Sequence, residues 1–360
     1  MTTPMMRTAI LSARRAGTVG AAVGLLVCLT FGASAKAELK LPPVDEVLKD
    51  LNFTAEDLQR AKEGKFVEKK MSEGSKRELS IGFALLTKAK PEDVAKMYRE
   101  ARDLETVKVI KSHARIAGNG TMADFEKVVL QPNPEKEAQR YLDAEPGDTL
   151  NLDEKEIAAF QALKSASKGK AVPVKEVEQL VRQGLLARLQ AYRTKGLAGI
   201  APYQRSKDSR VSAADELRLA TKQSVALAKY VPALHDVLMN YPAAKEKVKN
   251  ERFEESFYWF NLELFDRPTF VLAHRVSMFA DYAYVAVERQ FYTSHDYNAM
   301  QQITAAVQTK DGTLMFYIGR VSTDQVAGFT SVAAHPAART IMAPYIKEMF
   351  EAIRSRVETK

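Results

Sequence analysis

The residue types most able to do chemistry crowd into one heptapeptide, Phe291 to Tyr297, which reads FYTSHDY. Ser294, His295 and Asp296 have the residue types of a catalytic triad, in which nucleophile, base and orienting carboxylate must meet in space. Successive side chains of a strand point to opposite faces, so His295 is expected to point away from both neighbours. The sequence also contains no Gly-x-Ser-x-Gly elbow. We therefore expect His295 to organise a strand end or to anchor a ligand.

The histidines are too scattered to predict a metal site. They lie at positions 113, 235, 274, 295 and 335, and no two have the His-x-x-x-His spacing that binds zinc on one helix face. His274 belongs to an apolar strand pattern, where a histidine is usually a hydrogen-bonded core residue, although it could meet His295 if their strands pair. We predict neither a metal nor a cofactor.

Charged and aromatic residues in the same third of the chain are candidates for ligand binding. Arg275, Arg289 and Arg320 interrupt β-patterned runs, and a charge buried there would need a partner. Arg320 ends an otherwise apolar face, so it is the preferred candidate for binding an anionic headgroup or carboxylate. Aromatic side chains in a curved sheet would line an apolar pocket that has a few polar groups. The predicted pocket-lining residues are Tyr258, Trp259, His274, Tyr284, Tyr292, His295 and Arg320.

The N-terminus has the parts of a secretory signal peptide. Arg7, Arg14 and Arg15 precede an uncharged, mostly apolar stretch at 16–32, and small-x-small cleavage sites follow at 33–37. A transmembrane anchor is the alternative, but the stretch is short and rich in glycine and alanine for a ~30 Å hydrocarbon core. We expect cleavage of this segment and export, to the periplasm.

Export changes what the composition implies. Cys28 is the single cysteine and lies in the predicted signal peptide, so the mature chain would have no disulfide and no thiolate. Removing Arg7, Arg14, Arg15 and Lys36 from the 53 lysines and arginines leaves 49 against 45 acidic residues, a net charge of +4. This mild excess is spread along the chain and does not predict a nucleic-acid partner, which requires a clustered basic face.

The elements that must position these residues divide the chain by composition. After the signal peptide, 1–37, residues 38–64 form a lead-in. Residues 65–132 combine β-patterned runs with one helix and form the first part of a core. Residues 133–250 are polar, charged and helix-patterned, and residues 251–360 return to aromatic strands that end in an amphipathic helix. The predicted fold class is therefore α+β, an antiparallel curved sheet wrapped on a C-terminal helix, with an all-α insertion.

Hydrophobic patterns predict the individual elements, because alternation favours strands and a 3.6-residue period favours helices. The predicted strands are Phe66–Met71, Glu78–Thr87, Val107–Ile116, Asp124–Leu130, Phe253–Phe265, Thr269–Phe279, Tyr282–Tyr292, Asn298–Gln308 and Thr313–Val321. The predicted helices begin after Thr54, at Pro91, at Val174, after Ser212, at Pro232 and near Pro336, and Pro344 is expected to kink the last one or mark its start.

This order of elements resembles the START-like (helix-grip) superfamily, and the last third resembles a family of uncharacterised exported bacterial proteins. The matching residues are Phe257-Tyr258-Trp259, the turn at Arg267-Pro268, Val271 to Val276 with His274, and Phe291 to His295. The resemblance covers roughly 78–330 and is most specific in 255–320. It implies a START-like core with a cavity between sheet and last helix, and binding of a lipid or other apolar ligand. It carries over no catalytic residues, and the helical insertion departs from it.

Three functions are compatible with these patterns. The leading hypothesis is non-catalytic binding of an apolar or amphipathic small molecule, with lipid among the candidates, close to a membrane. The second is a cyclase- or hydrolase-like enzyme that uses His295 or His274 as acid–base, which requires both histidines to face one pocket. The third is a module that docks a protein partner, not identified by the sequence, through the insertion, which requires an exposed apolar stripe along Val174 to Tyr192.

Overall fold

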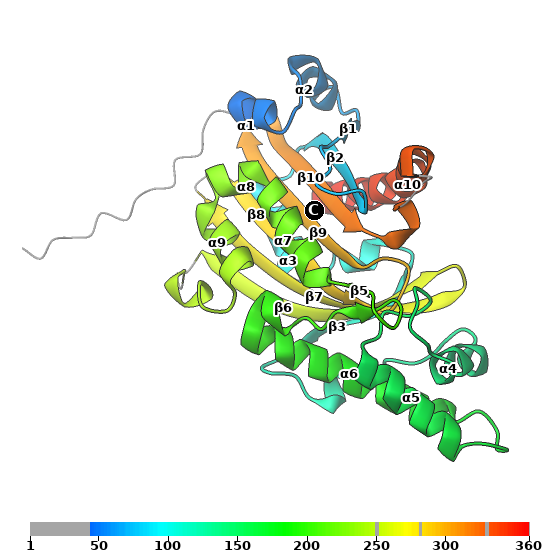
Figure 1. The fold of residues 1–360 in the computed structure, drawn as a ribbon. Coiled ribbons are helices and arrows are strands. Elements are labelled where there is room, and N and C mark those ends of the chain that lie inside the picture. Colours follow the sequence, from blue (N-terminus) through cyan, green and yellow to red (C-terminus); the bar gives the residue numbers. More distant parts are fainter. Residues whose placement is uncertain (1–43, 249–251, 281–282, 328–330, 360) are drawn as a thin grey trace, which may run out of the picture. The chain divides into compact units, whose positions relative to one another are not determined.

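The computed structural model describes residues 44–248, 252–280, 283–327 and 331–359. The predicted signal peptide and the first residues after its cleavage sites lie outside these ranges. Within the described part of the chain the fold is α+β: one large antiparallel sheet with helices on both faces (Figure 1). No helix among the described residues is both long and apolar enough to cross a membrane.

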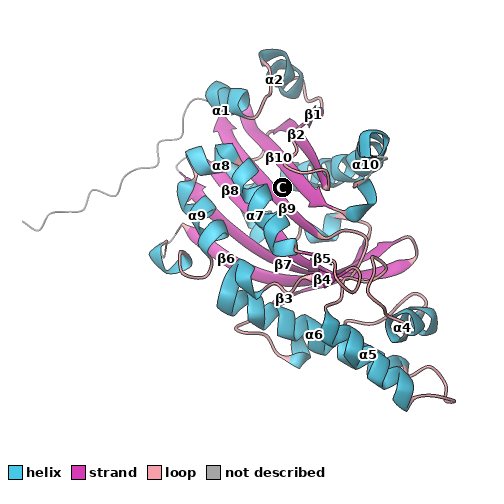
Figure 2. Cartoon of the chain, in the orientation of Figure 1, coloured by secondary structure: helices cyan, strands magenta, loops and turns pink. Residues whose placement is uncertain are grey.

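Eight strands form the sheet in the order β1-β2-β10-β9-β8-β7-β6-β3. Figure 2 shows them as one curved layer that does not close into a barrel. Strands β6 to β10 are consecutive hairpins, whereas β1 and β2 add to one side and β3 to the other. Their bounds are β1 Val67–Lys70, β2 Glu78–Thr87, β3 Ile110–Ile116, β6 Phe253–Leu264, β7 Arg267–Ala280, β8 Ala283–Thr293, β9 Ala299–Thr309 and β10 Gly312–Ser322.

One face of the sheet packs directly on α3 (Pro91–Arg99) and α10 (Ser331–Glu358). Phe350 and Ile353 of α10 are buried against Phe83 and Tyr317 of the sheet. Phe350 and Ile353 lie three residues apart, on one face of the helix, and Phe83 and Tyr317 point to the face of the sheet that the helix covers. The helical period and the strand alternation therefore bury their apolar residues in one core. Helix α10 begins before Pro336 and continues through Pro344, so the expected start near Pro336 is wrong.

The opposite face is covered by helices from the predicted insertion, α6 to α9, and by N-terminal helices α1 and α2 (Figure 1). The apolar stripe of α6, which includes Val181, Leu185 and Tyr192, is buried in the core on this face of the sheet. The remaining helices α4 and α5 pack on α6. The bounds are α1 Val44–Asp50, α2 Ala55–Lys62, α4 Pro134–Leu142, α5 Glu154–Ala166, α6 Val174–Lys195, α7 Ala213–Gln223, α8 Val225–Tyr230 and α9 Pro232–Asn240.

Two predicted elements differ from the structure for tertiary reasons. Asp124–Leu130 is not a strand, because its apolar residues Phe125 and Val128 are buried in the core beneath α6 without joining a ladder. The single helix expected from Ser212 to Tyr230 is broken at Ser224, which separates α7 from α8.

The hairpin turn between β6 and β7 also differs from the expected turn at Arg267-Pro268. Arg267 and Pro268 begin β7, and the turn is made by Phe265 and Asp266, both at positive φ.

A buried ion cluster connects the sheet to α3 and the segment after it. Arg275 donates to both carboxylate oxygens of Asp103 (3.0 and 2.7 Å), to Glu288 (2.6 Å) and to the carbonyl of Tyr98 (2.7 Å). Asp103, Arg275 and Glu288 are all buried, and burial raises the pKa of Asp103 above its ordinary value. One cation thus compensates two carboxylates in a region that water does not reach.

We expect Arg275→Met to lower the free energy of unfolding by about 3–5 kcal/mol, because both carboxylates would lose their buried cation. Urea denaturation measures this change. The control is Arg218→Met, which removes a guanidinium paired with Asp215 on the exposed side of α7 and should cost at most about 1 kcal/mol. Similar losses in the two variants would contradict the role given to the buried cluster.

Candidate ligand-binding site

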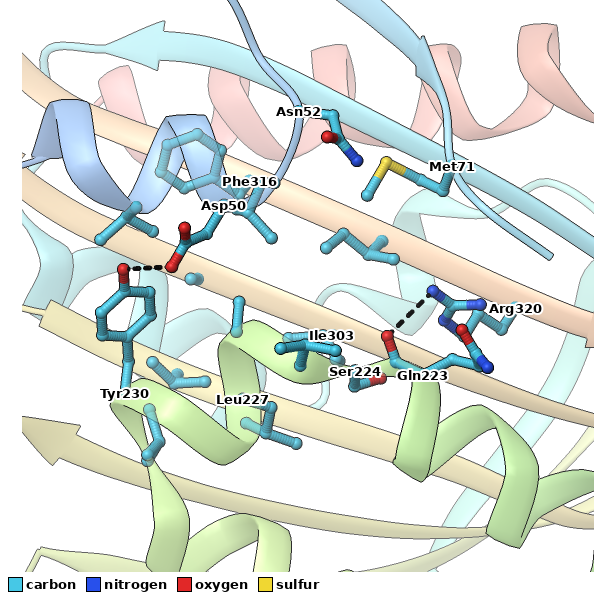
Figure 3. A pocket seen from close by; sticks show the side chains of 18 of the residues that line it. Asp50, Asn52, Met71, Gln223, Ser224, Leu227, Tyr230, Ile303, Phe316 and Arg320 are labelled. Atoms are coloured by element: carbon cyan, nitrogen blue, oxygen red, sulfur yellow. Dashed lines mark hydrogen bonds between the residues drawn. The ribbon is translucent and has the colours of Figure 1, made fainter. Parts of the chain in front are cut away.

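A cavity of about 300 Å³ lies between the sheet and helices α1 and α8 (Figure 3). Its floor is formed by β8, β9 and β10, and its roof by α1, the end of α7 and α8. Most of its lining is aliphatic, with polar groups toward two ends. The lining residues are Val47, Asp50, Leu51, Asn52, Met71, Ser72, Gln223, Ser224, Val225, Ala226, Leu227, Tyr230, Val231, Ala283, Val285, Ile303, Ala305, Val307, Phe316, Ile318 and Arg320.

Alternate residues of neighbouring strands form the floor. Ile303 and Ala305 share one face of β9, and Phe316 and Ile318 share the same face of β10 because side chains alternate along a strand. Ala305 and Phe316 are directly opposed in the ladder. The small side chain at Ala305 leaves space between the sheet and the helices above it.

The break between α7 and α8 forms part of the roof. Ser224 leaves the helical conformation (φ −84°, ψ 60°) while its hydroxyl donates to the carbonyl of Ala220 (2.8 Å). A serine hydroxyl can satisfy a nearby backbone group in this way and so stabilises the interruption. After the break, Ala226 and Leu227 of α8 line the cavity.

Polar contacts connect α1 to α8 at one end of the cavity. Lys229 donates to Glu46 (3.1 Å) and to Asp50 (2.8 Å), and the hydroxyl of Tyr230 donates to Asp50 (2.6 Å). The hydrogen bonds from Lys229 and Tyr230 hold the pKa of Asp50 below its ordinary value. Asp50 is therefore a carboxylate at neutral pH, and it is placed at the cavity end beside Tyr230 (Figure 3).

Arg320 lies at the other end, where Figure 3 shows it beside Gln223. Its side chain is 4% exposed. Nη1 donates to Glu78 (2.8 Å) and to the carbonyl of Ser72 (3.0 Å), and Nη2 donates to the carbonyl of Gln223 (3.3 Å). The Nε–H group has no hydrogen-bond partner among the described residues. The cavity thus ends at a cation whose charge is compensated but whose hydrogen-bonding capacity is incomplete.

The cavity differs in place from the one expected between the strands and the C-terminal helix. At that interface α10 packs on the sheet through a continuous apolar core that includes Phe83, Tyr317 and Phe350. The space is on the opposite face, beneath elements that come from the lead-in and from the predicted insertion. Of the seven predicted pocket-lining residues, Arg320 lines this cavity, and the other six lie elsewhere.

All six are buried, and three of them are Tyr258, Trp259 and Tyr284. Tyr284 packs between Phe279 and Tyr98 on the α3 side of the sheet. The ring of Tyr258 faces the guanidinium of Arg275, with 5.2 Å between the guanidinium carbon and the ring centroid. The indole N–H of Trp259 donates to the carbonyl of Asp124 (2.7 Å). Each aromatic side chain is part of a buried core cluster, and none of the three lines the cavity.

A β-bulge changes the direction of Tyr292. Leu272 pairs with Tyr292 and Ala273 with Gln290, so Phe291 is the extra residue in β8. A bulge interrupts strict alternation, and both Phe291 and Tyr292 consequently join the core on the α6 side. Tyr292 lies under the guanidinium of Arg188 (4.3 Å to the ring centroid) and borders a separate cleft of about 240 Å³ between α5 and α6.

His274 is buried in a chain of hydrogen bonds. The hydroxyl of Tyr192 lies 3.0 Å from its Nδ1, and the carboxylate of Glu255 lies 3.1 Å from its Nε2. Burial lowers the pKa of His274 despite the nearby Glu255. A neutral ring protonated at Nε2 then donates to Glu255 and accepts from Tyr192. Arg289 lies 3.4 Å from the same tyrosine hydroxyl, so this chain connects a buried cation to a carboxylate.

His295 is hydrogen-bonded to the beginning of β7. Its Nε2 lies 3.0 Å from the carbonyl of Pro268, and its Nδ1 lies 2.6 Å from the carboxylate of Asp296. The expectation that Asp296 points away from it is wrong, because Asp296 adopts φ 72° and turns the chain. The hydroxyl of Ser294 accepts from the backbone N–H of Phe270 (3.0 Å), and the histidine is 1% exposed.

The two histidines do not face one pocket. His295 contacts Pro268 and Thr269. His274 lies five residues beyond Thr269 in β7, which is about 17 Å along an extended strand. Among the described residues there is no group of three or more histidine, cysteine or acidic side chains placed to hold a metal. The geometry therefore does not supply the shared histidine pocket on which the enzyme hypothesis depends.

The functional candidates missed from sequence come from segments far apart in the chain. Asp50 and Tyr230 lie in two short helices that the sequence patterns did not connect, and Leu227 follows the unpredicted break at Ser224. A serine inside a helical pattern was one usable signal, because serine favours helix ends over helix interiors. The alternation in β9 that places Ile303 and Ala305 on one face was another.

No protein-family model matches this sequence, and a search of curated proteins finds no relative. The coarse fold class, α+β with a large curved antiparallel sheet, is shown by the structure. The resemblance to START-like proteins and to an exported bacterial family stays a prediction. Any function has to be argued from the site itself.

Glu255 should make stability depend on pH. Burial alone would raise its pKa, but hydrogen bonds from His274 and Lys245, together with the charge of Lys245, lower the pKa to about 2 from an ordinary 4.5. A carboxylate with a depressed folded-state pKa stabilises the fold above its unfolded pKa, and this contribution is lost as the pH falls toward the folded pKa. We expect Glu255→Gln to lower the free energy of unfolding by about 1.5–3 kcal/mol at pH 7. This deficit relative to wild type should narrow as the pH falls from about 4.5 toward 2.

Chemical denaturation of both proteins across this pH range measures the difference. Glu254→Gln is the matched control, since that neighbouring carboxylate is 37% exposed and pairs with Arg99 at the surface. A deficit in Glu255→Gln that stays constant down to pH 3 would refute the assignment.

Proposed function

We propose that this protein binds a small apolar or amphipathic ligand, without catalysis, in the cavity between the sheet and helices α1 and α8. The observation that carries the proposal is the cavity itself, which has a volume of about 300 Å³ and a mostly aliphatic lining. It lies on the face of the sheet opposite to the one that α10 fills. Pockets of this kind, apolar with a few convergent polar groups, are the usual form of small-molecule sites.

Burial of the ligand would supply most of the affinity. If on the order of 300 Å² of apolar ligand surface is removed from water, about 7.5 kcal/mol is gained at ~25 cal/mol per Å². Association itself costs about 4 kcal/mol or more. Apolar burial alone therefore predicts weak binding, and the polar groups at the cavity ends would contribute both affinity and orientation.

One prediction from the sequence and one observation from the structure also bear on the proposal. The predicted signal peptide favours an exported, periplasmic location, where a protein that carries an apolar molecule would work between or beside membranes. The apolar stripe of α6, whose exposure the interaction-module hypothesis requires, is instead buried at Val177, Leu185 and Leu189. Ligand binding is thus better supported than docking of a protein through α6.

Filling the cavity should abolish binding. Ala226 lines the cavity on α8, whereas Ala228 is on the same helix and does not line it. We expect Ala226→Phe to weaken binding of the neutral dye phenylnaphthylamine by about tenfold or more, a loss of about 1.4 kcal/mol, and Ala228→Phe to change it by less than about twofold.

Dye fluorescence titration measures these affinities, and native mass spectrometry of the purified proteins tests whether wild type retains an apolar molecule that Ala226→Phe lacks. Thermal unfolding confirms that both variants are folded. Undiminished dye binding by Ala226→Phe, or no dye binding by wild type, would rule the proposal out.

A further inference from the structure

We infer that a cleft at the beginning of α10 binds a phosphate monoester group, at a second site apart from the apolar cavity. The cleft has a volume of about 540 Å³ and lies between α10, the end of β1 and the loop that connects β1 to β2. We call it the basic cleft and define it by its ionisable lining residues, Lys70, Glu73, Lys76, His335 and Arg339. None of them lines the apolar cavity, so the inference does not depend on the proposed function.

Glu73 connects the loop after β1 to α10. His335 and Arg339 are four residues apart and therefore lie on one face of the helix. One carboxylate oxygen of Glu73 accepts from Nε and Nη2 of Arg339 (3.2 and 2.5 Å) and from the backbone N–H of Ser80 (3.2 Å). The other oxygen lies 3.0 Å from Nδ1 of His335, whose Nε2 lies 3.0 Å from the carbonyl of Lys76. The helix and the loop are thus held together on one side of the basic cleft.

Glu73 is fully engaged by these contacts. Burial alone would raise its pKa, but the hydrogen bonds from Arg339 and Ser80 lower the pKa below its ordinary value. The carboxylate is therefore ionised at neutral pH, and its charge is compensated by the guanidinium that it holds in place. It does not compensate any other cation of the basic cleft.

The guanidinium of Arg339 keeps one group available to a ligand. Its Nε and Nη2 groups donate to Glu73, whereas Nη1 has no hydrogen-bond partner among the described residues. Nη1 is not closed off from solvent, and the side chain as a whole is 13% exposed. A charged N–H donor of this kind forms short, strong hydrogen bonds with phosphate oxygens.

Alternation along β1 brings a lysine to the same side. Lys69 pairs with Asp57 of α2 (2.7 Å), on the face of the sheet opposite to α10. Successive side chains of a strand point to opposite faces, so Lys70 points to the face that α10 covers. Phe66 confirms this direction, because it belongs to the same face of the strand and its ring contacts Phe350 of α10.

The two lysines are the uncompensated charges of the basic cleft. Lys70 and Lys76 are both exposed, and neither has an ion-pair partner within the described part of the chain. With His335 counted as neutral, three cations and one carboxylate leave a charge of +2. Most surface charges of this protein are paired with a neighbour, so an excess of this size within one cleft distinguishes the site from the rest of the surface.

A phosphate monoester matches this arrangement better than a carboxylate does. It carries a charge of about −1.5 to −2 at pH 7 and three strong acceptor oxygens, whereas a carboxylate has one charge and two oxygens. Two ammonium groups and Nη1 of Arg339 supply donors from three directions. Among the described residues that line the cleft there is no phenylalanine, tyrosine or tryptophan to stack on a nucleobase, so the phosphate itself would provide the recognition.

Isothermal titration calorimetry with glycerol 3-phosphate tests the inference. Acetate at matched ionic strength is the comparison, because unspecific attraction between exposed charges is screened by salt and does not depend on the shape of the anion. We expect wild type to bind glycerol 3-phosphate at least about tenfold more tightly than acetate, since hydrogen bonds to charged groups contribute about 1.5–3 kcal/mol each.

The decisive variant combines Lys70→Gln with Lys76→Gln. It should bind glycerol 3-phosphate about tenfold or more weakly than wild type. The matched control combines Lys168→Gln with Lys175→Gln, two exposed lysines outside the cleft, which changes the net charge equally and should alter the affinity by less than about twofold. Thermal unfolding shows whether both variants are folded, as expected for substitutions of exposed side chains.

A phosphate monoester can belong to a soluble molecule or to a lipid headgroup, and a second arm distinguishes them. Phosphatidylcholine vesicles with and without phosphatidic acid are sedimented with each protein. Binding that requires phosphatidic acid and is lost in the cleft variant would assign the site to a lipid headgroup, whereas binding of glycerol 3-phosphate alone would assign it to a soluble ester. The inference is overturned if wild type binds neither, or if the cleft variant and its control lose affinity equally.

Discussion

One antiparallel sheet covered on both faces is the constraint on which the rest of this structure depends. The described residues of β8 are buried along the whole strand, so no side of it can be left to water. Antiparallel sheets commonly have one solvated face, and the alternation of Tyr284 to Tyr292 would ordinarily be read that way. Because helices cover both sides, every polar group on these strands must find a partner inside the protein.

The three arginines in the strands show how this requirement is met. Arg275 finds Asp103 and Glu288 on the α3 side. On the other side Arg289 donates to the carbonyl of Leu238 and to Thr221, while Arg320 pairs with Glu78. The partners come from helices, loops and neighbouring strands, so satisfying each buried charge also fixes a helix or loop over the sheet. Burying paired charges is not a gain in stability by itself, but losing one partner is expensive.

The cavity arises where the covering elements are short and the floor residues are small. The break at Ser224 ends α7, and the six-residue helix α8 together with α1 spans the remaining width. Polar contacts hold this roof at its ends, through Asp50 on one side and Gln223 on the other. Between these contacts the lining is hydrocarbon, which attracts apolar molecules and gives water few hydrogen bonds. Its position opposite α10 also means that the long C-terminal helix serves as core and not as a lid.

The sequence by itself determined the local features of this protein. The pattern of residues 78–87 predicted β2 with its observed bounds, Thr54 predicted the start of α2, and the alternation of β10 placed Arg320 at the end of an apolar face. These depend on propensity and on periods of two or 3.6 residues, which neighbouring residues set. Only the tertiary structure decided which face of the sheet is packed, that a bulge turns Tyr292 toward α6, and that residues 47–52, 71–72, 223–231 and 283–320 meet around one cavity. The physical reason is that a hydrophobic pattern reports that a side chain is buried, whereas the partner that buries it is chosen by contacts between segments far apart in the chain.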